Sequence, residues 1–143
     1  MRADQYVYFA VRSDDVTAVE VEERLGLRPD SVLVRGSRDP DRPVPAHHKW
    51  AVESQQRDRS LYDQIEEVLA RIAPVEAALT DLLSEGREIS YVLQVVRLLN
   101  DPDAPEEETL PLGFGFDRDA LQLLARLDAS IDVDEYDGAL GDE

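Results

Sequence analysis

The stretch ISYVLQVVRLL, residues 89–99, decides the fold of this chain. It is the run richest in β-branched and large apolar residues, which favour β-strands. Its alternate positions are largely apolar on both sides, as in a strand that is covered on both faces. We therefore predict that residues 89–99 form a central strand of the sheet.

Two amphipathic helices are expected directly before this strand, within residues 61–84. Apolar side chains recur there at helical spacing and form one stripe on each helix. Ser60 and Asp63 have the spacing of a capping box, and Pro74 suits the first turn of the second helix. Gly86 ends that helix. Both helices are predicted to cover one face of the sheet.

Further strands and helices are expected on either side of this central part. The other expected strands are residues 5–13, 32–34, 49–53, 112–116 and 130–136. A helix over 16–25 is predicted to be capped by Asp14 or Asp15 and closed by Gly26 in the left-handed conformation. A last helix is expected to be capped by Asp117 and to carry Leu121, Leu124 and Leu127 on one side.

These elements predict an α+β protein with one compact domain over residues 1–137. Its sheet is expected to be mixed but mostly antiparallel, with helices packed on it, and ferredoxin-like elements are compatible with this order. Residues 138–143 are expected to be an acidic C-terminal tail. Trp50 is expected in the core, with Gly26 and Gly36 at positive φ.

Charge is the most unusual feature of the composition. The net charge is −17 over 143 residues, and most of it lies in the second half of the chain. Residues 1–71 hold 11 basic and 14 acidic side chains, whereas residues 72–143 hold 4 basic and 18 acidic ones. Such a field repels nucleic acids and anionic membranes and attracts a cationic protein partner. A homo-oligomer is compatible with the sequence.

The residue inventory also limits the compartment and the chemistry. The chain has no cysteine, which excludes disulfides, thiol catalysis and cysteine-ligated metals. No apolar stretch is long enough for a signal peptide or a membrane span, so a cytoplasmic location is expected. Among 15 basic residues only Lys49 is a lysine, which favours a bacterial source. Phosphate-loop, nucleophile-elbow and HExxH motifs are absent, and no cofactor is expected.

One candidate ligand site is a basic island between Arg28 and Arg59. Arginine side chains match phosphate or carboxylate groups, and a nearby indole ring can stack on a ligand. The alternative is that these arginines pair with the chain's own acids and that the tryptophan belongs to the core. His47 and His48 are adjacent and would point to opposite sides of a strand, which disfavours a shared metal ion. The candidate ligand-binding residues are Arg35, Arg38, Arg42, His48 and Trp50.

A second candidate site is acidic. The residues predicted to bind a partner are Glu106, Glu107, Glu108, Asp132, Asp134 and Asp137. Asp132 and Asp134 are expected on one face of the last strand, with Ile131 and Val133 facing the core. This segment lacks the loop that wraps a divalent cation, so no metal site is predicted. The alternative is the solvated face of an edge strand.

Several landmarks of the chain resemble a known family. They are YVYF at residues 6–9, the Leu-Gly-Leu-x-Pro motif at 25–29, Arg35-Gly36, Trp50, and Ile-Asp-Val-Asp-x-Tyr at 131–136. Together they resemble bacterial domain-of-unknown-function family 4279. The resemblance implies an α+β single domain, and it implies an immunity-like role near toxin genes for some relatives. It implies no established activity.

These observations favour a non-enzymatic protein-binding module, immunity-like in the sense of the resemblance, that engages a basic partner through its acidic half. The alternative is a domain that binds an anion or a small molecule through the 35–42 loop and Trp50, with catalysis left open. Whether the protein is an enzyme also stays open, although the missing catalytic motifs favour a binding role.

Overall fold

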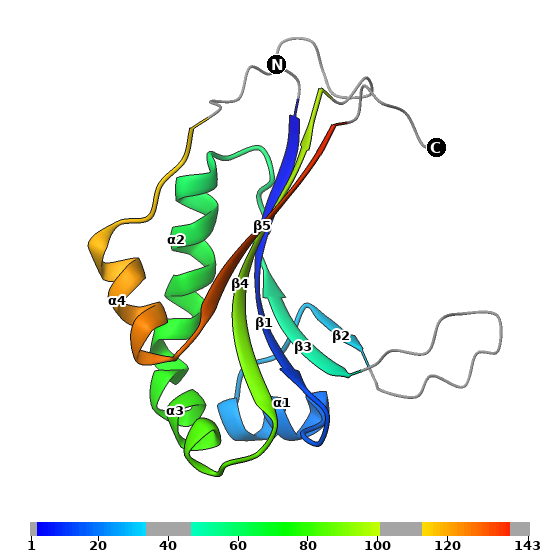
Figure 1. Ribbon diagram of the computed structural model, residues 1–143, viewed down its shortest axis with the longest axis vertical. Helices are drawn as coiled ribbons and strands as arrows, with labels where there is room; N and C mark the ends of the chain where they lie inside the picture. Colours follow the sequence, from blue (N-terminus) through cyan, green and yellow to red (C-terminus); the bar gives the residue numbers. More distant parts are fainter. Residues whose placement is uncertain (1–2, 34–46, 101–112, 138–143) are drawn as a thin grey trace, which may run out of the picture.

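A single twisted sheet carries helices on one side in the computed structural model (Figure 1). The structure describes residues 3–33, 47–100 and 113–137. Within these ranges the elements are, in chain order, β1 (Ala3–Ser13), α1 (Ala18–Leu25), β2 (Ser31–Leu33), β3 (His48–Glu53), α2 (Leu61–Ile72), a 3₁₀ turn η1 (Ala73–Val75), α3 (Glu76–Ser84), β4 (Ile89–Leu99), α4 (Arg118–Arg126) and β5 (Ser130–Asp137).

The strand order is β2-β3-β1-β4-β5. Neighbouring strands are antiparallel, except that β5 runs parallel to β4. The path from β1 to β4 follows the βαββαβ order of a ferredoxin-like unit, and α4 with β5 extends it by one strand. The predicted α+β class and the mostly antiparallel mixed sheet are therefore confirmed.

The predicted strand over residues 89–99 is confirmed with the same bounds. β4 lies inside the sheet between β1 and β5, and β1 is the middle strand of the five. β1 and β4 pair along their whole length, from Ala3 opposite Leu99 to Ser13 opposite Ile89. This ladder fixes which side chains of both strands face the helices.

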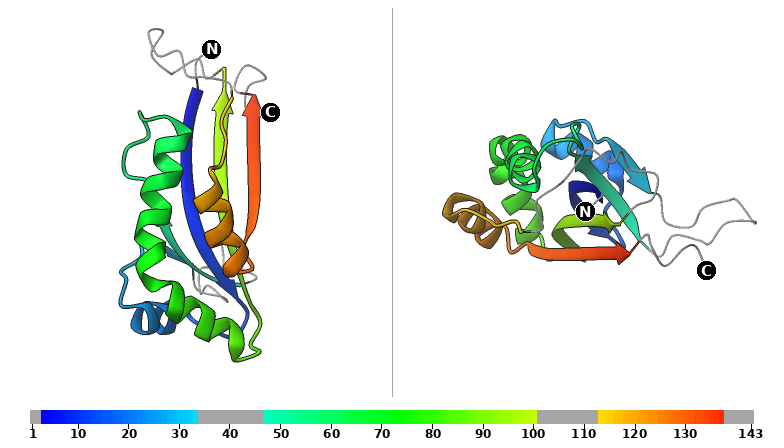
Figure 2. Two further views of the ribbon diagram at one scale, coloured as in Figure 1. Left: turned by 90° about the vertical axis from the view of Figure 1, so that its left-hand side faces the viewer. Right: turned by 90° about the horizontal axis from the view of Figure 1, so that it is seen from above.

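The main core lies between the sheet and the helices, which all lie on one side of it (Figure 2). Alternate residues of the strands enter this core, because successive side chains of a strand point to opposite faces. The strand residues in it are Val7, Phe9, Val11, Trp50, Val52, Tyr91, Leu93 and Val95. Helices α2 and α3 supply much of the cover, as predicted for residues 61–84.

The opposite face of the sheet has a second, smaller cluster. Ala10, Ala51 and Val92 are buried there, and Tyr8 packs against them. The register places Ala10 directly opposite both Ala51 and Val92, so small side chains form a row across three strands. Larger polar and aromatic side chains lie on either side of this row.

Several local predictions are confirmed. Gly26 closes α1 with φ +64°, and its N–H bonds to the Glu22 carbonyl. Ser60 caps α2 by accepting a hydrogen bond from the Asp63 N–H, and Asp117 caps α4 in the same way. Trp50 is fully buried. Gly36 lies outside the described residues.

Three local predictions are wrong. The cap of α1 is Thr17 rather than Asp14 or Asp15, because the Ser13 hydroxyl holds the preceding turn and delays the helix. Residues 113–116 form no strand.

Leu121 is exposed, because α4 begins at its cap Asp117 and this start turns a different row of side chains toward the core. That row is Ala120, Leu123, Leu124 and Leu127.

Phenylalanines alternate with glycines at residues 113–116, although this segment is not a strand. The Phe114 and Phe116 rings meet edge to face, with centroids 6.1 Å apart, and both pack against the core. The buried guanidinium of Arg97 lies 5.3 Å from the centre of the Phe114 ring. The two apolar positions therefore reflect packing of this irregular segment on the sheet.

The burial of Trp50 leads to a stability prediction. Trp50→Ala should lower the free energy of unfolding by about 3–5 kcal/mol, because truncating a buried large aromatic leaves a cavity. Val32 is the cross-strand neighbour of Trp50 but is 50% exposed, so Val32→Ala is the matched control. Urea unfolding followed by circular dichroism measures both. Equal, small effects of the two changes would contradict the described core.

Candidate functional site

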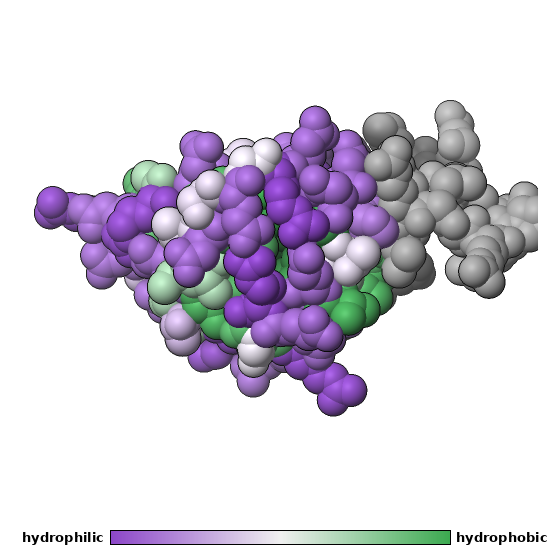
Figure 3. Space-filling view, turned by 90° about the horizontal axis from the view of Figure 1, so that it is seen from below, coloured by the Kyte–Doolittle hydropathy of each residue, from purple (hydrophilic) through white to green (hydrophobic). Residues whose placement is uncertain are grey.

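A pocket opens at one end of the sheet. Because β1 is antiparallel to both β3 and β4, the last residues of β1 meet the first residues of the other two strands. The pocket has a volume of about 430 Å³, within the range of small-molecule sites. It is lined by Arg12, Ser13, Asp14, His47, Arg87, Glu88, Ile89 and Ser90. The surface at this end is mainly hydrophilic (Figure 3).

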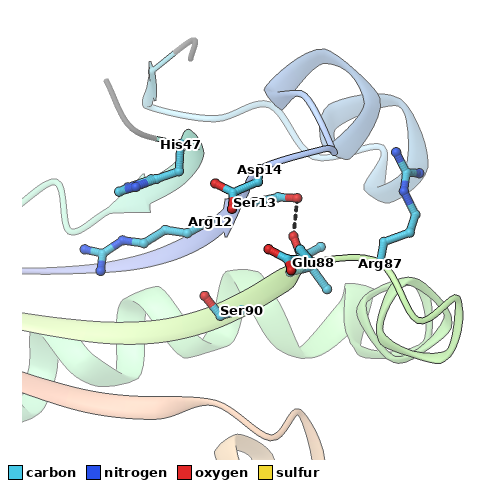
Figure 4. Close-up of a pocket in the computed structure, with 8 residues that line it drawn as sticks. Arg12, Ser13, Asp14, His47, Arg87, Glu88 and Ser90 are labelled. Carbon is cyan, nitrogen blue, oxygen red and sulfur yellow. Dashed lines mark hydrogen bonds between the residues drawn. The ribbon is translucent and has the colours of Figure 1, made fainter. Parts of the chain in front are cut away.

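Ser13 holds the floor of the pocket together. Its hydroxyl is hydrogen-bonded to the Glu88 carbonyl, a contact between residues far apart in the chain (Figure 4). The same oxygen accepts hydrogen bonds from the N–H groups of Asp15, at 3.2 Å, and Val16, at 2.9 Å. The hydroxyl is thus used to join β1, β4 and the turn before α1, which is a structural role.

Arg87 neutralises acids beside the pocket. Its guanidinium lies 2.7 Å from a Glu20 carboxylate oxygen and 3.7 Å from one of Glu85. It also donates a hydrogen bond to the Asp15 carbonyl at 3.0 Å. Figure 4 shows the side chain directed away from those of Arg12 and His47. Its charge is therefore shared among α1, α3 and the turn between β1 and α1.

Arg12 and Lys49 bring positive charge to the face of the sheet beside the pocket. They are cross-strand neighbours on β1 and β3, and the Lys49 ammonium lies 4.2 Å from the centre of the Tyr8 ring. The Arg12 Nε is buried and meets no hydrogen-bond acceptor in the part of the chain that the structure describes. This edge of the pocket can therefore hold an anionic group.

The half-buried groups in this region titrate away from their ordinary values. Burial lowers the pKa of Lys49, and repulsion by the Arg12 cation lowers it further, whereas Glu53 opposes the shift. Burial also raises the pKa of Tyr8, against the influence of Arg12.

The predicted ligand-binding residues do not converge on one described site. Arg35, Arg38 and Arg42 lie outside the described residues. His48 is half-buried on β3, where it pairs with Ser13 in the register. The Trp50 ring is enclosed in the core on the helix side of the sheet, so its faces are not open to solvent.

The predicted partner-binding residues fall in two groups. Glu106, Glu107 and Glu108 lie outside the described residues. The others, Asp132, Asp134 and Asp137, lie on β5, the outer strand next to β4.

The apolar residues of β5 are less buried than predicted. Ile131 and Val133, expected to face the core, are 37% and 38% exposed. They pair in register with Leu93 and Val95, which do face the helices, but β5 is the outermost strand and its cover is incomplete. Over residues 131–134, β5 therefore alternates exposed apolar side chains on one face with acidic side chains on the other.

Arg12 was not predicted from the sequence as a site residue. The signal was available in part, since Arg12 is the only charged residue in the apolar run of residues 5–13. Its proximity to Lys49 depends on the β1–β3 register, which the sequence does not specify. Among the described residues no group of three or more His, Asp or Glu side chains is arranged to hold a metal ion. No helix in these ranges is long and apolar enough to cross a membrane.

The topology places the protein among α+β proteins that cover one face of a single sheet with helices. The chain belongs to the family described as "Domain of unknown function (DUF4279)", which matches residues 4–138. The resemblance found in the sequence is therefore confirmed at the level of the family. No curated protein and no solved structure matches the chain.

The environment of Lys49 gives a prediction about its titration. Reductive ¹³C-methylation labels this single lysine and the N-terminal amine, which titrates at a lower pH. We expect the pKa of Lys49 to be lower in the folded protein than in urea, because burial disfavours the cation. Arg12→Gln should raise this pKa, and Glu53→Gln should lower it. A pKa that ignores both changes would contradict the described cluster.

Proposed function

We propose that the protein is a non-enzymatic protein-binding module that engages a basic partner through its acidic half, with β5 as the contact strand. One form of such a module is the immunity-like role that the family resemblance implies, in which the partner would be a toxin. The proposed place of action is the bacterial cytoplasm, which the cysteine-free, arginine-rich composition favours.

The observation that carries this proposal is the character of β5. This strand of eight residues forms one edge of the sheet, and no other described strand pairs with its outer side. Edge strands offer unpaired backbone groups to an extended segment of another chain. On β5 these groups are flanked by exposed apolar side chains, such as Tyr136 at 56% exposure, and by the carboxylates of Asp132 and Asp137.

Charge decides which segment would pair there. Two copies of β5 side by side would bring carboxylates close to carboxylates, and like charges on neighbouring strands are destabilising. A segment that alternates basic and apolar residues would instead place its cations near Asp132 and Asp134. Residues 72–143, which include β5, carry the larger share of the net charge and would speed the approach of such a partner.

The proposal is tested with a variant that removes charge but keeps shape. Asp132→Asn, Asp134→Asn and Asp137→Asn together should weaken capture of a basic protein by the immobilised module at least about 10-fold at low salt. The matched control, Arg12→Gln with His47→Gln, changes the pocket at the sheet end and should leave capture intact. Captured proteins are identified by mass spectrometry, and their affinities are measured by calorimetry.

The opposite pattern would contradict the proposal. If the control loses the captured protein while the β5 variant keeps it, the sheet-end pocket is the contact and the acidic strand is not. Self-association of the wild-type protein through β5, seen by sedimentation, would also contradict it.

A second candidate function is the binding of a small anion in the sheet-end pocket. The unpartnered, buried Nε of Arg12 favours it, because a buried donor without an acceptor is costly unless a ligand supplies one. Acetate and inorganic phosphate, titrated separately, should shift the Arg12 Nε signal in NMR spectra, and Arg12→Gln should abolish binding. A signal that stays unchanged at high concentrations of both anions would rule this function out.

A further inference from the structure

A groove runs between α2 and α4 on the outer side of the helix layer. Its volume is about 480 Å³. The floor is apolar and is made of Leu69, Ala70, Ala73, Ala120 and Leu123. Leu69 and Leu123 are nearly buried, whereas Ala70 and Ala73 are exposed, so the small residues keep the groove open.

Carboxylates gather at one part of the groove's rim. Glu66 comes from α2, Asp117 caps α4, and Asp119 lies in the first turn of α4. The Tyr62 hydroxyl donates a hydrogen bond to Asp117 Oδ2 at 3.0 Å. Hydrogen bonding to Glu66 and then to Asp117 raises the pKa of Tyr62 to about 12. One hydroxyl thus lies within reach of two carboxylates from different helices.

The Tyr62 hydroxyl cannot fill all the hydrogen-bond acceptor positions of these two carboxylates. A hydroxyl has a single proton to donate, whereas each carboxylate has two acceptor oxygens. It also brings no charge, so both carboxylates on this rim keep their negative charge without a cation from Tyr62. A cation placed between the two carboxylates would balance their charge and fill their remaining acceptor positions.

The cation that belongs to the groove is already engaged. Arg126 lies on the lining, and its guanidinium makes two hydrogen bonds of 3.0 Å to the two carboxylate oxygens of Glu76. This fork-like pair fixes the arginine at the α3 end of α4 and matches its charge. The excess of negative charge at the other part of the rim is left for a ligand.

We propose that the groove between α2 and α4 holds a lysine side chain of the basic partner, with its ammonium between Glu66 and Asp117. The four methylenes of the lysine lie on the floor formed by Leu69, Ala70 and Leu123, as long basic side chains do on apolar surfaces. The three ammonium donors face the carboxylates on the rim. This inference rests on the proposed function and adds a second contact, away from β5.

The first experiment uses a minimal probe instead of the partner. n-Hexylammonium and n-hexanol are titrated separately into the protein labelled with ¹³C at the methyl groups of alanine and leucine. The ammonium should shift the signals of Ala70, Ala73 and Leu123 and should bind at least about 10-fold more tightly than the alcohol, because charge-assisted hydrogen bonds add to apolar contact.

Variants then separate charge from shape. Glu66→Gln with Asp117→Asn removes both charges, and the asparagine keeps the helix cap. It should weaken hexylammonium binding at least about 10-fold. Asp132→Asn with Asp134→Asn changes the net charge equally but lies on β5, so it should leave the binding unchanged. Ala70→Leu, which fills the floor, should abolish it.

The outcomes are distinct. Equal binding of hexanol, or equal loss in the β5 control, would overturn the lysine site. In a second arm, the protein captured by the wild-type module is offered to the Glu66→Gln, Asp117→Asn variant, which should bind it at least about 10-fold more weakly. Undiminished capture would overturn the groove's role and leave the proposed function standing. If the wild type captures no basic protein, the proposed function fails, and the probe titration alone decides whether the groove takes an alkylammonium.

Discussion

The pairing of β1 with β4 is the constraint on which the rest of the structure depends. Eleven residues of each strand are paired, from one end to the other. A slip of one residue would turn the apolar set of either strand away from the helices. The same register brings Ser13 to Glu88, which builds the sheet-end pocket, and leaves the far edge of β4 for β5. Core, pocket and acidic edge therefore follow from one ladder.

Basic and acidic side chains gather at different parts of the fold. Arg12 and Lys49 are neighbours on β1 and β3 beside the sheet-end pocket, whereas β5 and the start of α4 carry mainly carboxylates. Several other arginines of the described residues pair with acids of the chain, as Arg71 does with Asp30 at 2.6 Å. Among the described residues, the sheet-end pocket is lined by both cations and acids, whereas β5 and the groove between α2 and α4 combine carboxylates with exposed apolar side chains.

Local sequence patterns predicted most of the helices and strands. The apolar run of β4, the cap at Ser60 and the glycine after α1 act through near neighbours, and each was predicted from the sequence. The Thr17 cap was not, because Ser13 is held by Glu88, 75 residues away.

The candidate sites were harder to predict from the sequence, because they also depend on contacts between distant parts of the chain. Arg12 lies opposite Lys49 through a strand register, and Glu66 and Asp117 reach the same Tyr62 hydroxyl from different helices. Arg35 and Glu106 lie outside the described residues.

Hydrogen–deuterium exchange of the protein, with and without its captured partner, tests most directly where binding takes place. We expect the acidic half to be the binding surface. Exchange should then slow in β5 and along the facing parts of α2 and α4, with no change at residues 12–14, 47–49 and 87–90. Protection confined to those three segments at the end of the sheet, with β5 and the helices unchanged, would contradict this expectation.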